Sequence, residues 1–318
     1  MLKKQSRRLA VSGSLAYDQI MDFPGKFHDH ILPGQIHNLN VSFLIGALRR
    51  SFGGTAGNIA YNLSLLGLKP LLFGVVGSDF LAYEKWLKKN GTDLSQIAKV
   101  DDKVTAAAYI ITDQTDNQIT AFYPGPDIKN YARRAASVPH LDLAIIAADD
   151  TKRMLEYATI YRQKKVPFIF DPGQQLTALN DAELRGAIKG AKVLIGNDYE
   201  IKLISKRLKL NLAALAKMVE ILVVTKGGTG SEIYSAGKKV VVPPAKPKNT
   251  SDPTGAGDAY RAGLIYGLLA GYDLKTCGQL AGLVAVYTVE AFGTQTHQFM
   301  IAELRKRYYD NYREKLVI

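Results

Sequence analysis

The sequence contains little cysteine and no long hydrophobic run. Cys277 is the one cysteine among 318 residues, which excludes an internal disulfide framework and favours a reducing compartment. The longest apolar candidate, residues 259–292, is interrupted by charged side chains, so it cannot supply the ~18 apolar residues that a membrane helix needs. The basic start of the chain imitates a signal peptide only faintly, and a first buried strand is the better interpretation. We therefore expect a cytoplasmic protein without a membrane partner.

Several nucleotide-binding motifs are also missing. The spacing of a P-loop and the glycine-rich loop of protein kinases do not occur. A dinucleotide-binding oxidoreductase would need Gly-x-Gly-x-x-Gly after the first strand, and residues 13–16 are Gly-Ser-Leu-Ala instead. These absences disfavour three common classes of nucleotide-using protein.

Acidic residues are the minority, with 29 Asp and Glu against 41 Lys and Arg and a net charge of +12. Such a field attracts anionic ligands. The charges are spread along the chain, and the most basic stretch, residues 305–315, interleaves tyrosines with its charges. That pattern favours a solvated terminal helix with tyrosines packed inward over a nucleic-acid patch, so we expect no nucleic-acid partner.

Strand-like and helix-like runs alternate, which is typical of an α/β fold with a mostly parallel sheet. The apolar content of 47% is enough for a sizeable core. Continuous apolar runs predict strands covered on both faces at residues 9–14, 71–76, 141–147, 166–170, 192–195 and 221–225. Helices are predicted at residues 58–66, 151–164, 181–190, 211–220, 255–270 and 274–287.

Two early regions, residues 36–45 and 105–122, look extended and do not fit that alternation. Strands inserted early in an α/β unit often form a lid over the site. We therefore expect one domain, 1–318, with lid segments around residues 14–50 and 103–125. The sequence leaves the oligomeric state open between monomer and homodimer.

The sharpest chemical signal is Asp252-Pro-Thr-Gly-Ala-Gly-Asp258, followed by a helix-like run. Gly255, Ala256 and Gly257 are small enough to turn tightly at a helix start, where backbone N–H groups and the helix dipole favour an anion. Asp258 is placed to accept a proton from a hydroxyl while that anion site stabilises a transferring phosphoryl group. The alternative is an N-capping Asp in a glycine-rich turn. The motif favours phosphoryl transfer.

Two segments offer substrate contacts. In Phe52-Gly-Gly-Thr-Ala-Gly-Asn58, Gly53 and Gly54 allow close backbone approach to a ligand, and Asn58 can hydrogen-bond vicinal hydroxyls; a plain loop-to-helix turn is the alternative. Asp18 follows the first strand, and an Asp at a strand's carboxyl end faces the crevice where α/β folds bind ligands. We expect its carboxylate to accept two hydrogen bonds from a cis diol.

Two further segments follow predicted strands. Asn197 and Glu200 can jointly orient waters around Mg²⁺, which keeps several of its waters; a helix N-terminus with Glu in its first turn is an equal alternative. The run Thr225-Lys-Gly-Gly-Thr-Gly230 could hold nucleotide phosphates, although a glycine-rich turn is weak evidence by itself.

Together these five segments resemble the ribokinase/PfkB family of small-molecule kinases, over nearly the whole chain and in the family's order. The resemblance implies a ribokinase-like three-layer α/β/α sandwich with a small β lid, and transfer from ATP, with Mg²⁺, to a primary hydroxyl. It implies these roles: Asp258 as the base; Gly255, Ala256 and Gly257 as the anion hole; Asn197 and Glu200 around Mg²⁺; Thr225, Gly228 and Gly230 beside the nucleotide; Asp18, Gly53, Gly54 and Asn58 around the acceptor.

This sequence departs from the family pattern at Pro253, where ribokinases usually have Thr, but it keeps the acidic and glycine positions of the motif. Their presence argues against a purely regulatory protein on the same scaffold. In some relatives the residue equivalent to Asp252 helps to bind a monovalent cation such as K⁺, and the sequence leaves this open.

The acceptor is suggested by two other segments. Residues 13–25 with Asn40-Val-Ser-Phe43, and Gly293-Thr-Gln-Thr-His297, are most similar to bacterial proteins described as adenosine kinases. The resemblance favours a nucleoside, adenosine giving AMP, over the alternative of a sugar or sugar phosphate. Phe43, Phe122 and Tyr123 could stack on a purine, although packing within the lid is the simpler role.

Overall fold

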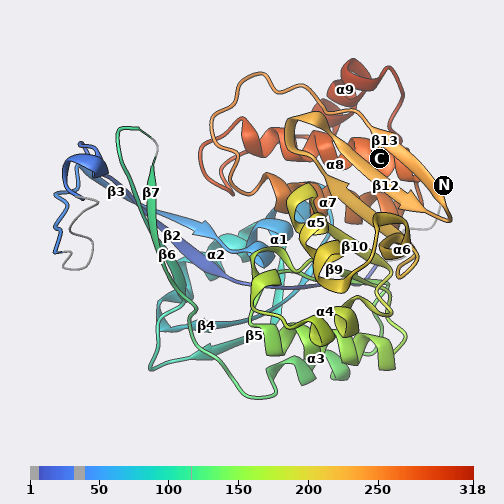
Figure 1. Cartoon of the computed structure of the whole chain (residues 1–318), viewed down its shortest axis with the longest axis horizontal. Coiled ribbons are helices and arrows are strands. Elements are labelled where there is room, and N and C mark those ends of the chain that lie inside the picture. Colours follow the sequence, from blue (N-terminus) through green and yellow to red (C-terminus); the bar gives the residue numbers. More distant parts are fainter. Residues whose placement is uncertain (1–6, 32–39, 116) are drawn as a thin grey trace.

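The structure is a computed structural model that describes residues 7–31, 40–115 and 117–318. Within these ranges a central sheet has the order β13-β12-β11-β10-β9-β8-β1-β4-β5 (Figure 1). Neighbours from β11 to β5 are parallel, and β12 and β13 form an antiparallel edge. The strands are β1 (Leu9–Ser12), β4 (Leu71–Gly77), β5 (Asp93–Val100), β8 (Leu143–Ile146), β9 (Phe168–Phe170), β10 (Val193–Asn197), β11 (Ile221–Thr225), β12 (Ser231–Ser235) and β13 (Lys238–Val242).

Helices cover both faces of this sheet, which is why strands such as β4 and β8 are buried along their whole length. On one face α3, α4 and α5 pack with Met154, Leu184 and Ile204. On the other face α1, α2, α7 and α8 pack, and α9 lies against α8. The helices are α1 (Thr55–Leu65), α2 (Leu81–Lys89), α3 (Thr151–Gln163), α4 (Asp181–Ile188), α5 (Asp198–Leu208), α6 (Leu212–Ala216), α7 (Ala256–Ala270), α8 (Leu274–Val289) and α9 (Ile301–Tyr312). The predicted three-layer α/β/α sandwich is confirmed.

A second sheet, the lid, has the order β3-β2-β6-β7 and projects from the core (Figure 1). Its strands are β2 (Ala16–Asp22), β3 (Ala47–Gly53), β6 (Ala106–Thr112) and β7 (Gln118–Tyr123). The extended region predicted at residues 105–122 is therefore confirmed as β6 and β7. The region predicted at 36–45 is not: residues 36–39 lie outside the described ranges, and residues 40–45 form no strand. The strand that pairs with β2 is β3 instead.

The predicted core strands are all present, whereas the helix ends differ more. Helix α1 begins at Thr55 rather than Asn58, directly after Gly54, whose φ of 85° breaks the preceding strand. Helix α6 ends at Ala216 rather than at residue 220. In α9, Tyr308 is buried as predicted, but Tyr309 is 46% exposed, so the expectation of inward-packed tyrosines is wrong for that residue.

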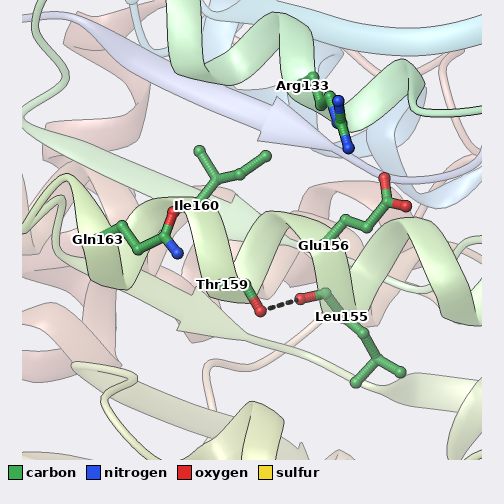
Figure 2. A pocket seen from close by; sticks show the side chains of 6 residues that line it. All are labelled: Arg133, Leu155, Glu156, Thr159, Ile160 and Gln163. Carbon is green, nitrogen blue, oxygen red and sulfur yellow. Dashed lines mark hydrogen bonds between the residues drawn. The ribbon is translucent and has the colours of Figure 1, made fainter.

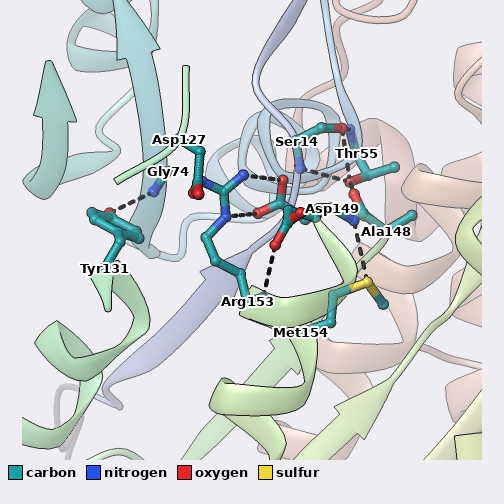
Figure 3. A network of polar contacts seen from close by, with 10 residues as sticks. Ser14, Thr55, Gly74, Asp127, Tyr131, Ala148, Asp149, Arg153 and Met154 are labelled. Carbon is teal, nitrogen blue, oxygen red and sulfur yellow. Dashed lines mark hydrogen bonds and ion pairs between the residues drawn. The ribbon is translucent and has the colours of Figure 1, made fainter. Parts of the chain in front are cut away.

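The carboxyl ends of β1 and β8 are tied to the start of α1 (Figure 3). The N–H of Ser14 donates to the hydroxyl of Thr55, and that hydroxyl donates to the carbonyl of Ala148, at 3.2 and 2.9 Å. Next to Ala148, the carboxylate of Asp149 accepts two hydrogen bonds from Arg153, at 3.0 and 2.9 Å. These contacts fix the edge of the sheet at which the candidate site lies. No helix in the described ranges combines the length and apolar character that crossing a membrane requires.

Candidate active site

A pocket of about 560 Å³ lies where the carboxyl ends of the central strands meet the lid. It is lined by Ser14, Asp18, Gly54, Thr55, Asn58, Ala108, Phe122, Ala148, Asp171, Gln174, Asn197, Glu200, Thr225, Gly227, Gly255, Gly257, Asp258, Arg261 and Thr294, among others. Another hollow, of about 380 Å³, lies against α3 (Figure 2), where the hydroxyl of Thr159 donates to a carbonyl of its own helix. Polar groups from many elements converge only in the first of these two, which is therefore the candidate site.

Asp258 lies in the first turn of α7, and small residues build the start of this helix. Gly255 has a φ of 78°, which glycine adopts without strain. Among the described residues, the N–H groups of Gly255 and Gly257 have no acceptor, whereas the N–H of Ala256 donates to the carbonyl of Pro253 at 3.2 Å. The helix start therefore presents free N–H groups to the pocket, but Ala256 contributes less than the sequence predicts.

The carboxyl group of Asp258 is electrostatically unusual. Burial raises its pKa to about 7, against the opposing effects of a hydrogen bond from Asn58 and of the nearby Arg261. The Nδ2 atom of Asn58 donates to Oδ2 of Asp258 at 2.8 Å. Asp258 is not the N-cap of α7, since that position is Gly255 and no side chain caps the helix. A carboxylate with a pKa near neutrality suits a general base at physiological pH.

The structure adds two charged residues that the sequence analysis missed. The Nε and Nη2 atoms of Arg261 donate to the two carboxylate oxygens of Asp171, at 2.8 and 2.7 Å, and both side chains are buried. Arg261 also donates to the carbonyl of Gly257 at 3.3 Å, so the pair supports the first turn of α7. Asp171 follows a predicted strand and could have been found by the rule that was applied to Asp18.

Asp18 lines the pocket, but it lies within lid strand β2 rather than at the carboxyl end of the first core strand, which corrects the predicted position. Burial, with Asp252 nearby, raises the pKa of Asp18 to about 6. A Cβ on Gly53 would lie 2.3 Å from Oδ2 of Asp18, and a Cβ on Gly54 would lie 2.5 Å from the carbonyl oxygen of Ser14. Both positions thus require glycine because other parts of this chain, Asp18 and the backbone of Ser14, lie close to them.

Asn197 and Glu200 form a reciprocal capping box at the start of α5. Each backbone N–H donates to the other residue's side-chain oxygen at 2.8 Å, so the alternative interpretation as a helix N-terminus is correct. Both residues nevertheless line the pocket, and burial raises the pKa of Glu200. The described residues contain no group of three or more acidic, histidine or cysteine side chains that could hold a metal ion. The side-chain oxygens of Asn197 and Glu200 fit Mg²⁺ bound through water, because Mg²⁺ keeps most of its hydration shell.

The predicted nucleotide segment lies only partly in the pocket. Thr225 ends β11 and lines it, together with Gly227. Gly228 follows Gly227, and a Cβ added there would meet no neighbour. Gly230 has a different role: its φ is 94°, and a Cβ would lie 2.1 Å from the carbonyl oxygen of Val242. Gly230 therefore allows the turn into the β12–β13 hairpin.

Of the predicted aromatic and cation-binding residues, only Phe122 lines the pocket. Phe122 lines the pocket, whereas Phe43 packs against other phenylalanines of its own loop, at ring distances of 4.8 and 5.2 Å. Tyr123 follows Phe122 on β7 and so points to the opposite face of the lid. The carboxylate of Asp252 accepts from the N–H groups of Thr254 and Gly293, at 2.9 and 3.0 Å, and its role toward a monovalent cation stays a prediction.

Comparison with known proteins defines the class. Residues 15–299 match the pfkB family of carbohydrate kinases, so the chain belongs to this family and the resemblance in its motifs is confirmed. The chain is 34% identical over 312 residues to a nucleoside kinase of Methanothermobacter thermautotrophicus, covering 96% of each chain. The structure of Burkholderia thailandensis nucleoside kinase in complex with inosine is similar with a TM-score of 0.85 and 35% identity, covering 96% of this chain and 99% of that one. A complex of the same kinase with ADP-inosine gives a TM-score of 0.83 and 37% identity, covering 96% and 97%.

Proposed function

We propose that this chain transfers the γ-phosphoryl group of ATP to the 5′-hydroxyl of a nucleoside. The observation that carries the proposal is that Asp258 and the start of α7 line the same pocket as Asp18 of the lid. A base and an anion site then lie within reach of a hydroxyl group that the lid holds. Membership of the pfkB family supports phosphoryl transfer, and the similarity to nucleoside kinases supports a nucleoside as the acceptor.

In this proposal Asp258 is the general base. Its carboxylate accepts the proton of the attacking hydroxyl while the new O–P bond forms and the bond to the leaving ADP breaks. The N–H groups of Gly255 and Gly257 stabilise charge on the transferring phosphoryl oxygens. Arg261 adds positive charge beside them and holds the carbonyl of Gly257. Because the pKa of Asp258 is about 7, the ionised fraction of the base rises through neutral pH.

The nucleotide side of the pocket is formed by Asn197, Glu200 and Thr225. Asn197 and Glu200 would hold Mg²⁺ through water, and Mg²⁺ neutralises phosphate charge when it is bound. A monovalent cation such as K⁺ near Asp252 remains part of the proposal, and its effect is measured in the assay below.

A row of lid residues favours a nucleoside over a free sugar. Asp18 pairs with Ala108, and Ala108 pairs with Phe122, so the three side chains lie on one face of the lid. All three line the pocket. Since neighbouring strands lie about 4.8 Å apart, Phe122 lies about 10 Å from Asp18, and the small side chain of Ala108 leaves the space between them open. We propose that Asp18 binds the ribose hydroxyls and that the base stacks on Phe122, which is 53% exposed.

Among nucleosides we propose a purine nucleoside. The early segments favour adenosine, giving AMP, and the complex of a similar kinase with inosine makes inosine the second candidate. A purine provides apolar surface at roughly 25 cal/mol per Å² buried. Stacking on an aromatic ring adds about 0.5–1.5 kcal/mol.

The test is ATP consumption by the purified protein with adenosine, inosine, ribose and fructose 6-phosphate, at equal ATP and Mg²⁺, with and without K⁺. We expect a purine nucleoside to have a clearly higher kcat/KM than ribose. Phe122→Ala should lower kcat/KM for the nucleoside by up to about tenfold, which corresponds to the lost stacking energy. The same substitution should change kcat/KM for ribose very little. Tyr123→Ala, which removes the neighbouring aromatic from the opposite face, is the matched control. Equal or better use of ribose or the sugar phosphate would refute the nucleoside assignment, and phosphorylation of none of the four would refute the proposed function.

A further inference from the structure

Behind Asp258 lies a buried chain of amide side chains that the proposed mechanism does not use. Gln295, which follows α8 in the Gly-Thr-Gln-Thr-His segment, donates from Nε2 to Oδ1 of Asn58 at 3.0 Å and to the hydroxyl of Tyr83 at 2.6 Å. Its Oε1 accepts from the indole Nε1 of Trp86 at 3.0 Å. Asn58 in turn donates to Asp258 at 2.8 Å. Asn58 and Gln295 are each only 4% exposed, so water does not compete for these bonds.

The direction of every hydrogen bond in this chain is fixed from its far end. An indole N–H can only donate, so the oxygen of Gln295 must face Trp86 and its nitrogen must face Asn58. The hydroxyl of Tyr83 donates to the carbonyl of Gly53 at 2.9 Å, so it too can only accept from Gln295. If the Gln295 amide were rotated, its NH₂ group would face the N–H donor of Trp86 and its oxygen would face the acceptor oxygen of Asn58. Both hydrogen bonds would be lost.

The other end of the chain agrees with this direction. Because Gln295 donates to Oδ1 of Asn58, the Nδ2 group of Asn58 is the one that faces Asp258, and an ionised carboxylate can only accept. The packing leaves room for this arrangement: a Cβ on Gly57 would lie 1.8 Å from the Tyr83 hydroxyl oxygen and 3.2 Å from Nε2 of Gln295. The third glycine of the Phe52–Asn58 motif thus serves the amide chain.

We propose that Gln295, oriented by Trp86 and Tyr83, is a positioning residue that keeps the Asn58 amide nitrogen against Asp258. The inference rests on the proposed function, because it gives the base of that reaction its partner. A protonated Asp258 can still accept from Asn58 through its carbonyl oxygen, but a hydrogen bond to an ionised carboxylate is stronger. The fixed Asn58 amide therefore favours the ionised form. Without Gln295, the Asn58 amide is free to rotate and to present its oxygen to the carboxyl group.

Several other groups also influence the pKa of Asp258, and Gln295→Leu removes none of them. They are Arg261 on α7, Asp171 after β9, Asp18 on β2, Tyr83 on α2 and Glu200 on α5, which acts on Arg261. Burial is the main cause of the raised pKa of Asp258, and the Asn58 hydrogen bond is the first effect that lowers it. Loss of that hydrogen bond therefore raises the pKa further.

Gln295→Leu tests the inference. We expect the acid limb of the kcat/KM profile with the nucleoside, near pH 7 in the wild type, to move upward by about one pH unit. At pH 6, activity should then fall about tenfold, and above pH 9 it should return to near the wild-type value. Trp86→Phe removes the anchoring N–H and keeps an aromatic ring at this position, so it should move the acid limb in the same direction by less. It also keeps the test open if Gln295→Leu does not fold.

Gln279→Leu is the matched control. Gln279 is 2% exposed, and its side chain accepts a hydrogen bond from Tyr308 at 2.5 Å, away from the pocket. This variant should lose comparable thermal stability and leave the pH profile unmoved. A Gln295→Leu profile that overlays the wild type, or an equal move in Gln279→Leu, would overturn the inference.

A second readout does not depend on activity. The ¹³C carboxyl resonance that disappears in Asp258→Asn is titrated in the ligand-free wild type and in Gln295→Leu, and the variant should titrate at higher pH. If the wild type phosphorylates no nucleoside, the proposed function fails while this titration still decides the role of Gln295. If the wild type is active and the titration does not move, only the inference fails.

Discussion

Replacing Asp258 by asparagine separates the chemistry of the site from its stability. The two side chains have nearly the same size, and the new amide oxygen can still accept the hydrogen bond that Asn58 gives to Oδ2 at 2.8 Å. An amide cannot take the proton of a hydroxyl group. We therefore expect turnover to fall by ~10²–10⁴-fold, the usual cost of removing a general base, while ATP still binds.

The same substitution should stabilise the protein at alkaline pH. Burial raises the pKa of Asp258 from 3.8 to about 7, so the folded chain disfavours the ionised form. The contribution of this group to stability is fully present below pH 4 and is lost as the pH rises through 7. At about 1.36 kcal/mol for each pKa unit, the loss is at most about 4 kcal/mol. The Asp258→Asn variant has no charge at this position, so it does not lose this stability as the pH rises.

Two measurements decide this prediction. Turnover is followed by ADP release with a saturating nucleoside, and melting temperatures of wild type and variant are compared between pH 4 and pH 8. We expect the variant to melt higher at pH 8 and at the same temperature near pH 4. Near-normal turnover would refute the base role, and a lower melting temperature at pH 8 would refute the electrostatic reasoning. Calorimetric ATP binding shows whether the site is intact.

Asp18→Ala should raise KM for the acceptor about ten- to hundred-fold and leave KM for ATP nearly unchanged, since a buried hydrogen bond to a charged group contributes about 1.5–3 kcal/mol. Asp22→Ala, on the same strand and face but ion-paired outside the pocket, is its control, and equal effects on both KM values would indicate a folding defect. Arg261→Gln should cost about 3–5 kcal/mol of stability and move the acid limb of kcat/KM upward, because Arg261 lowers the pKa of Asp258. Arg153→Gln breaks a similarly buried pair outside the pocket and should cost comparable stability with no such move; equal moves in both would contradict the assigned role.

The features that could be predicted from the sequence are those whose physics is local. The residues before Asp258 are small and form the start of α7, so the candidate anion site and its carboxylate are visible in one short segment. Strands such as β4 and β11 are continuous apolar runs because both of their faces are covered. Lid strand β3 has no such signature: Arg49 and Arg50 are both exposed, so the strand shows no alternation. The sequence prediction missed this strand and was wrong for residues 40–45, which form no strand.

The features that could not be predicted depend on contacts between distant segments. Asp171 lies 90 residues from Arg261, and Gln295 lies 237 residues from Asn58, so no spacing rule relates them. Asp18 looked like a residue at the end of a core strand, and only the pairing of β2 with β3 and β6 shows that it belongs to the lid. Local motifs thus indicated the proposed chemistry, whereas the residues that support the candidate base became visible only from tertiary contacts.

Trp86 is the only tryptophan of the chain. Its indole stacks with Phe52 and Tyr61, at ring distances of 6.0 and 5.7 Å, and donates to Gln295. The emission of an indole depends on the partner of its N–H group and on the polarity around its ring. Two amide side chains therefore connect an intrinsic fluorophore to the carboxylate of Asp258. Excited at wavelengths that tyrosine does not absorb, it gives an optical signal from behind the site in real time, with no label added to the protein.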